Sequence, residues 1–170
     1  ILLGFAYLDE VFFLLTKTPS ESIAKAEAMV QKAATIEGFM ARENNLLGLI
    51  YVVKKDYDKA IASAEKAIEQ MPSNAGSYLT LGIALRSNGQ YEESISSIKK
   101  ALQLNPVRPV SYLTSLAWAY LGSQQYEKAI ANLNETLERN PDDLFAYMGL
   151  TVAYWATGLE DQAKQAAKHI

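Results

Sequence analysis

Hydrophobic residues recur at spacings of three and four along almost the whole chain, in runs separated by short polar breaks. This spacing is typical of one buried face of an α-helix, and Gly, Asn and Pro often interrupt helices. The Ser-Asn-Gly segment at 87–89 is such a break, and Pro72, Pro106 and Pro141 each follow a helical run. The pattern predicts an all-α chain of short helices joined by tight turns.

The helical pattern also repeats along the chain. When the stretch that ends at Pro106 is aligned with the one that ends at Pro72, an offset of 34 residues places Gly82 on Gly48. The next stretch matches after 35 residues, because the connector after Pro106 has one extra residue. Each unit has the pattern of a helix, a turn and a second helix. We predict five units in a single array, at about residues 1–40, 41–74, 75–109, 110–143 and 144–170, with the last one incomplete.

Small residues occupy matching slots in the helices of the units. Larger side chains there would push the two helices of a hairpin apart, so we expect these slots to be buried where the helices approach. A tyrosine also recurs at the turn, at Tyr57, Tyr91 and Tyr126. The small residues are Gly48, Gly82, Ala117, Ala60, Ala129 and Ala163.

Small residues in both helices, a tyrosine at the turn and a closing proline at this period resemble the tetratricopeptide repeat. The tryptophan that usually stands near the start of the first helix is replaced here by Asn44, Tyr78, Leu113 and Tyr147. The resemblance implies an all-α fold, a right-handed α-solenoid of about five helical hairpins. Such hairpins stack because one alone cannot bury its apolar face, and the stack presents an extended concave surface.

The segment 105–150 also resembles the repeat tails of bacterial class III adenylate cyclases and related multidomain signalling proteins. The extra connector residue and the Pro-Val-Ser-Tyr start at 109–112 carry this likeness. It implies that the chain belongs to a larger bacterial signalling protein whose catalytic domain precedes Ile1. A start at Ile1 rather than at methionine agrees with a fragment of a longer protein.

The resemblance also implies which residues meet a partner, because the first helix of each hairpin lines the inside of the curve in this family. The inward residues would be those that flank the small-residue slot. We expect the partner-binding set to be Asn45, Leu49, Val52, Val53, Leu79, Thr80, Ile83, Arg86, Thr114, Ser115, Trp118, Phe145, Met148, Val152 and Trp155.

This set is mostly apolar, which suits an amphipathic helix, a hydrophobic peptide or a second copy of the array. A clamp for a C-terminal carboxylate is disfavoured, because it uses several Lys, Arg and Asn side chains and only Arg42, Asn45 and Arg86 are available. Trp118 and Trp155 fit either a groove or the core. Two functions stay open: a scaffold that binds a protein or peptide partner, and a module that forms a homodimer and brings attached catalytic domains together.

Composition excludes several other classes. The chain has 170 residues, of which 49% are hydrophobic and 21% charged, as in a folded domain. Its formal charge is −3 and its basic residues are scattered, so we expect no nucleic-acid partner. The absence of cysteine favours a reducing compartment, and we expect a cytoplasmic protein. Asp9 and Glu10 interrupt the apolar start, so we expect no membrane insertion.

Candidate chemistry is sparse in this sequence. The one histidine, His169, has no partner nearby in the sequence that could orient it for a serine-histidine-carboxylate triad. No Gly-rich phosphate loop and no zinc or calcium spacing occurs. We therefore expect a protein that is not an enzyme, with no catalytic residues, no cofactor, no metal site and no small-molecule substrate.

Overall fold

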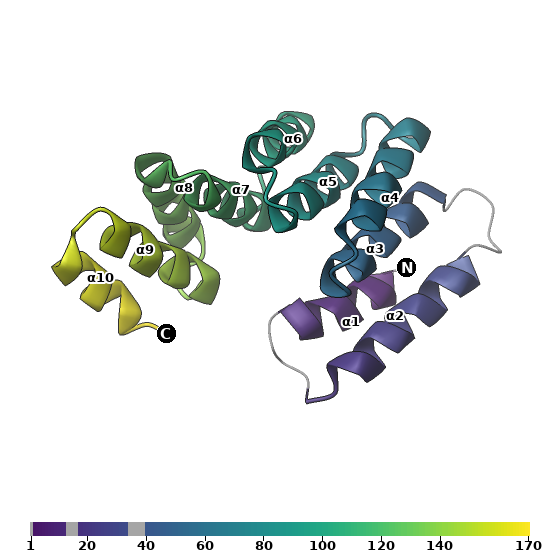
Figure 1. Cartoon of the computed structure of the whole chain (residues 1–170), viewed down its shortest axis with the longest axis horizontal. Coiled ribbons are helices and arrows are strands. Elements are labelled where there is room, and N and C mark those ends of the chain that lie inside the picture. Colours follow the sequence, from purple (N-terminus) through teal and green to yellow (C-terminus); the bar gives the residue numbers. More distant parts are fainter. Residues whose placement is uncertain (1, 13–16, 34–39) are drawn as a thin grey trace.

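A computed structural model describes residues 2–12, 17–33 and 40–170 of the chain. These residues fold into consecutive α-helices (Figure 1). The helices are α1 (Leu2–Phe12), α2 (Pro19–Ala33), α3 (Met40–Val53), α4 (Tyr57–Gln70), α5 (Ala75–Ser87), α6 (Tyr91–Leu104), α7 (Val110–Gly122), α8 (Tyr126–Arg139), α9 (Leu144–Ala156) and α10 (Glu160–Ala167).

Successive helices pair into hairpins, α1 with α2, α3 with α4, and so on to α9 with α10. The small-residue slots lie where the paired helices touch, as predicted. A Cβ added at Gly82 would lie 2.4 Å from Ile98 Cγ1, and one added at Gly48 would lie 3.3 Å from the Ala60 carbonyl oxygen. Because these distances leave no room for a side chain, glycine permits the close crossing of the two helices.

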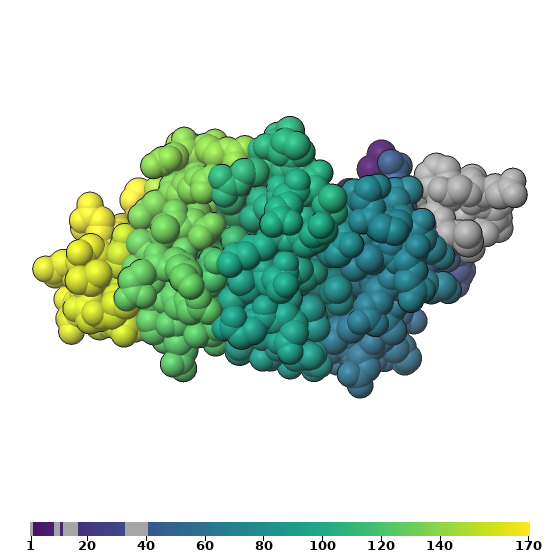
Figure 2. Space-filling view, turned by 90° about the horizontal axis from the view of Figure 1, so that it is seen from above, coloured from purple at the N-terminus to yellow at the C-terminus, as the bar shows by residue number. Residues whose placement is uncertain are grey.

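The hairpins stack into a solenoid with a core that continues from unit to unit. Ile98 of α6, Tyr120 of α7 and Ala153 of α9 belong to one buried cluster, which therefore joins three successive hairpins. Leu8, Ala26 and Leu46 form a second cluster, which joins α1 and α2 to α3. The predicted all-α solenoid of helical hairpins is confirmed. Figure 2 shows the hairpins as successive bands of colour across the molecule.

Polar caps fix where two of the first helices begin. The Asn74 side chain accepts a hydrogen bond from the Gly76 amide at 2.9 Å, and the Asp143 side chain accepts one from the Ala146 amide at 2.9 Å. Each cap satisfies an amide that has no partner inside its helix. These caps set the starting points of α5 and α9, two of the helices on which the candidate surface is built.

First and second helices pack differently along the stack. Each first helix contacts the first helix of the next hairpin: α1 contacts α3, α3 contacts α5, α5 contacts α7 and α7 contacts α9. Within the described residues, no second helix contacts the second helix of the next hairpin. The first helices therefore lie closer together, and the stack curves with them on the inside.

The apolar start of the chain forms a short helix, α1, that packs against α2 and α3. Leu8 is buried in this contact, whereas Leu2 and Leu3 are exposed. Over the described ranges, no helix is long and apolar enough to cross a membrane. The predicted end of the first unit, near residue 40, falls beside a connector that lies outside the described residues.

Candidate partner-binding surface

Charge separates the first helices from the second helices. α5, α7 and α9 together contain one charged residue, Arg86. The second helices α6 and α8 carry several acidic and basic side chains each. Since α5, α7 and α9 line the inside of the curve, this part of that side carries a single charged residue. We call the face of these three helices that is turned toward the inside of the curve the inner surface.

The inner surface of α9 exposes three large apolar side chains. Met148, Val152 and Trp155 are spaced four and three residues apart, which places them on one face of the helix. Their exposed fractions are 36%, 48% and 51%. We call these three residues the apolar stripe. A tryptophan that leaves half of its area in water adds a large apolar surface to it.

Other predicted surface residues are half-buried, and several of them pack against the buried clusters. Leu79 and Trp118 pack against the buried cluster that contains Tyr120, and Ile83 packs against Val52 and Ala84. The remaining members of this half-buried group are Leu49, Val53, Thr114, Ser115 and Phe145. The Thr114 hydroxyl donates a hydrogen bond to the Val110 carbonyl at 3.1 Å, as a helix residue often does.

Three predicted surface residues are instead part of the interior. Asn45 is only 5% exposed, and its Nδ2 donates a hydrogen bond to Ser77 Oγ at 3.1 Å, across the contact of α3 with α5. Val52 is 8% exposed and packs with Ala60 and Ala84. Thr80 is buried as well. A neighbouring hairpin covers each of them, through α5 for Asn45 and Val52 and through α3 for Thr80, so their burial contradicts the prediction that they face a partner.

Arg86 and Trp118 are brought together in one cavity of about 330 Å³. The cavity lies where the ends of α5 and α7 meet the start of α6, and we call it the Arg86 cavity. Gly122 lets the Tyr91 ring come close, since a Cβ at residue 122 would lie 2.2 Å from Tyr91 Cε1. The residues that line the cavity are Arg86, Ser87, Tyr91, Trp118, Leu121 and Gly122.

Four of these lining residues were not predicted from the sequence. Leu121 could have been found, because it follows Arg86 by the 35-residue step of its unit and so occupies the same slot. Tyr91 belongs to a second helix, and Gly122 carries no side chain. Their contribution depends on how α6 lies against α7, which the sequence pattern does not specify.

The electrostatics of the Arg86 cavity centre on one cation. Burial lowers the pKa of the Arg86 guanidinium from its usual value, and Tyr91 opposes this shift. Arg86 forms none of the ion pairs made by described residues, and no side-chain hydrogen bond involves it there. The Trp118 indole Nε1 is buried and also has no hydrogen-bond partner in that part of the chain.

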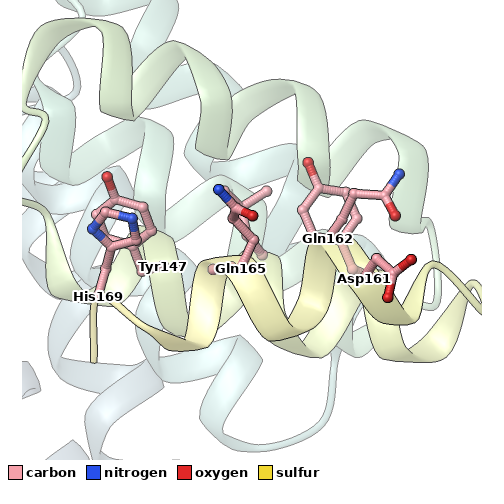
Figure 3. A pocket seen from close by; sticks show the side chains of 8 residues that line it. Tyr147, Asp161, Gln162, Gln165 and His169 are labelled. Atoms are coloured by element: carbon pink, nitrogen blue, oxygen red, sulfur yellow. The ribbon is translucent and has the colours of Figure 1, made fainter.

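A second cavity, of about 350 Å³, lies at the C-terminal end of the array between α9 and α10. Figure 3 shows the His169 ring lying over the Tyr147 ring at one side of this cavity and Asp161 at the other. The two rings are stacked, with centroids 4.2 Å apart. Leu150 and Tyr154 also line it and occupy the slots of Leu116 and Tyr120, which α9 covers in the preceding unit. We therefore assign this cavity to the end face of the stack rather than to the inner surface.

The described residues offer little for catalysis or metal binding. No group of three or more His, Asp or Glu side chains in the described ranges could hold a metal ion. His169 contacts an aromatic ring rather than a carboxylate. The features that remain in the described part of the chain are an apolar surface and one half-buried cation, Arg86.

The tetratricopeptide repeat family matches this sequence over residues 41–74, 73–142 and 120–170. The three stretches together cover the chain from Ala41 to Ile170 and agree with the helical hairpins described above. The chain is therefore a tetratricopeptide repeat protein. No curated protein matches the sequence.

Several solved structures share this fold. MamA superposes with a TM-score of 0.68 at 24% identity, over 90% of this chain and 89% of MamA. PilW, a widely conserved type IV pilus biogenesis factor, gives 0.78 at 19% identity, over 98% of this chain and 75% of PilW. YrrB, a tetratricopeptide repeat protein with an unusual peptide-binding site, gives 0.65 at 20% identity, over 96% and 82%. At these identities the likeness concerns the fold alone.

Proposed function

We propose that this chain is a protein-interaction module, in which the inner surface of α5, α7 and α9 binds a segment of a partner protein. The observation that carries the proposal is the exposed apolar stripe of Met148, Val152 and Trp155 on helices that hold a single charge. Exposed apolar residues that gather on one face usually mark an interface. Tetratricopeptide repeat proteins bind protein partners, and the peptide-binding site of YrrB agrees with such a role.

The geometry of the stripe favours a partner segment with its own apolar face. Trp155 is a large aromatic side chain of the kind that contributes most to binding. The half-buried side chains of Trp118 and Ile83 extend the apolar surface toward α5. An amphipathic helix would lay its apolar positions along such a groove and keep its polar face in water. We also propose that this module lies beside other domains of a larger bacterial signalling protein, since residues 105–150 resemble the repeat tails of such proteins.

Peptide selection tests the proposed surface directly. A random peptide library, displayed so that every peptide is fused to its carrier through its C-terminus, is selected on the wild-type chain. Selected peptides are then measured against Trp155→Glu, which places a charge in the stripe. We expect binding to weaken by at least about tenfold, because an aromatic anchor is lost and a charge must be desolvated.

The matched control is Val107→Glu. Val107 is 74% exposed and lies in the connector between α6 and α7, so this variant adds the same charge to an exposed apolar residue outside the inner surface. Circular dichroism checks that both variants stay helical. Peptides that bind wild type and Trp155→Glu equally well would show that the inner surface is not the binding site.

A further inference from the structure

Arg86 is the one charged side chain on the inner surface, and nothing in the described protein neutralises it. The acidic residues that follow it most closely, Glu92 and Glu93, are exposed at the start of α6. The Glu92 carboxylate accepts a hydrogen bond from Gln125 Nε2 at 2.9 Å instead. A guanidinium offers several N–H donors in a planar fork, and here all of them are left for another molecule.

Stacking of the hairpins does not require a charge at this position. The slot that Arg86 occupies in its unit is filled by Val52, Leu121 and Trp155 in the others, and all three are apolar. A cation without a counter-charge costs stability when it is removed from water. A charge in this slot therefore works against the fold, which suggests that it serves binding.

The walls of the Arg86 cavity would strengthen an interaction with an anion. Trp118, Leu121 and the Tyr91 ring are apolar surfaces around the guanidinium, and a low local dielectric increases the attraction between opposite charges. Trp118 Nε1, a buried donor, also has no partner in the described part of the chain. A single cation with this surrounding matches one carboxylate better than a phosphate, whose greater charge usually requires several cations.

We propose that the Arg86 cavity receives the carboxylate of an internal Asp or Glu side chain of the partner segment. This inference rests on the proposed function, because it assigns a side chain to the segment that binds the inner surface. The carboxylate belongs to an internal residue, since half-buried apolar residues lie before the cavity at Ile83 and the apolar stripe lies beyond it on α9. A partner segment that contacts both Ile83 and the apolar stripe must pass over the Arg86 cavity, so its chain end does not lie there.

The test uses the peptides selected above on the wild-type chain, synthesised with amidated C-termini so that no terminal carboxylate is present. We expect the selected sequences to share an acidic residue at one internal position. Replacing that residue by Gln or Asn should weaken binding to wild type by about tenfold or more, because a charge-assisted hydrogen bond is lost. The same peptide change should have no effect on binding to Arg86→Met.

Two further variants make the result specific to this cavity. Lys100→Met removes an exposed cation of α6 outside the cavity and should keep the full preference for the acidic peptide. Trp118→Phe keeps the aromatic ring without the indole N–H and should reduce the preference in part. The wild-type indole N–H signals of Trp118 and Trp155, followed by ¹⁵N NMR, give a second readout, and the signal of Trp118 should shift with the acidic peptide.

Distinct failures separate this inference from the proposed function. Peptides without a shared internal acid that still lose binding to Trp155→Glu would overturn the role of Arg86 and leave the interaction surface standing. An acidic residue that matters equally on wild type and on Arg86→Met would overturn it as well. A second library with free C-termini that yields only a terminal carboxylate would refute the internal position. If no selected peptide depends on Trp155, both proposals fail.

Discussion

At the scale of single residues, Arg86 is the side chain whose surroundings match its chemistry least. Its guanidinium is half-buried without an ion-pair or hydrogen-bond partner among the described residues, and this partial burial lowers its pKa. A lowered pKa in the folded state means that folding disfavours the charged form. Because arginine remains protonated under all ordinary conditions, titration does not relieve this cost. Arg86 should therefore reduce the stability of the folded protein.

The first prediction concerns that cost. Arg86→Met keeps a long flexible side chain and removes the charge, so we expect the free energy of unfolding to rise by about 1 kcal/mol. The gain should be constant between about pH 5 and about pH 9, since no group with a pKa in that range is involved. Urea denaturation at several pH values measures it. Lys100→Met, at an exposed position, should change stability by less than about 0.5 kcal/mol, and a loss of stability in Arg86→Met would show that Arg86 has a structural role.

At the scale of the elements, each hairpin depends on a close crossing of its two helices. In the α5–α6 hairpin the crossing brings Gly82 against Ile98, and the Ser94 hydroxyl donates a hydrogen bond to the Gly82 carbonyl at 2.7 Å. The helices can hold this separation only while one of the two facing residues stays small. Helix propensity alone would favour alanine over glycine by about 1 kcal/mol. Glycine at position 82 is therefore explained by the close packing of the two helices and not by helix propensity.

The second prediction separates the effect of helix propensity from the effect of packing at position 82. We expect Gly82→Ala to destabilise the chain by about 1–3 kcal/mol, because the new methyl group cannot fit beside Ile98. Ile98→Ala alone should cost about 2–5 kcal/mol through the cavity that it leaves. The double variant should be less destabilised than the sum of the two, and denaturant unfolding of all four proteins measures the coupling. Strict additivity would mean that the two side chains do not compete for space.

The elements and their order could be predicted from the sequence because they depend on local spacing. The 34-residue period locates the hairpins, and Gly82 and Ala129 lie buried at the crossings that it indicates. The candidate site could be predicted only in part. Met148 and Trp155 occupy the same slots as Asn45 and Val52, yet they are exposed while Asn45 and Val52 are buried, because burial in these slots depends on a neighbouring hairpin, as Asn45 depends on Ser77. The Arg86 cavity depends on side-chain volumes from three helices, which no spacing rule contains.

At the scale of the whole molecule, the inner surface could be used in two ways. The apolar stripe could face a segment of another protein, or two copies of the chain could bury their stripes against each other. The two uses place the same residues in contact but differ in stoichiometry. The lone cation favours a different partner over a second copy, because the only charged residue that another inner surface of α5, α7 and α9 could offer to Arg86 is an identical arginine.

The third prediction follows from that repulsion. We expect sedimentation equilibrium to give the mass of one chain, 18.8 kDa, across a wide range of concentrations. Trp155→Glu and Val107→Glu should give the same mass. A wild-type mass that rises with concentration, and that returns to one chain in Trp155→Glu but not in Val107→Glu, would instead identify the stripe as a homodimer contact.

Among the described helices, contacts extend from each hairpin to the hairpins directly beside it and no further. Cooperativity in such a stack is passed between neighbours, so opening begins at the ends and advances inward. The hairpins α5–α6 and α7–α8, which meet at the Arg86 cavity, have a neighbour on either side. Their amides should exchange hydrogen with solvent more slowly than those of α1 or α10. The Arg86 cavity should therefore stay formed while the outer hairpins fray, whereas the anchor Trp155 lies on α9 of an outer hairpin.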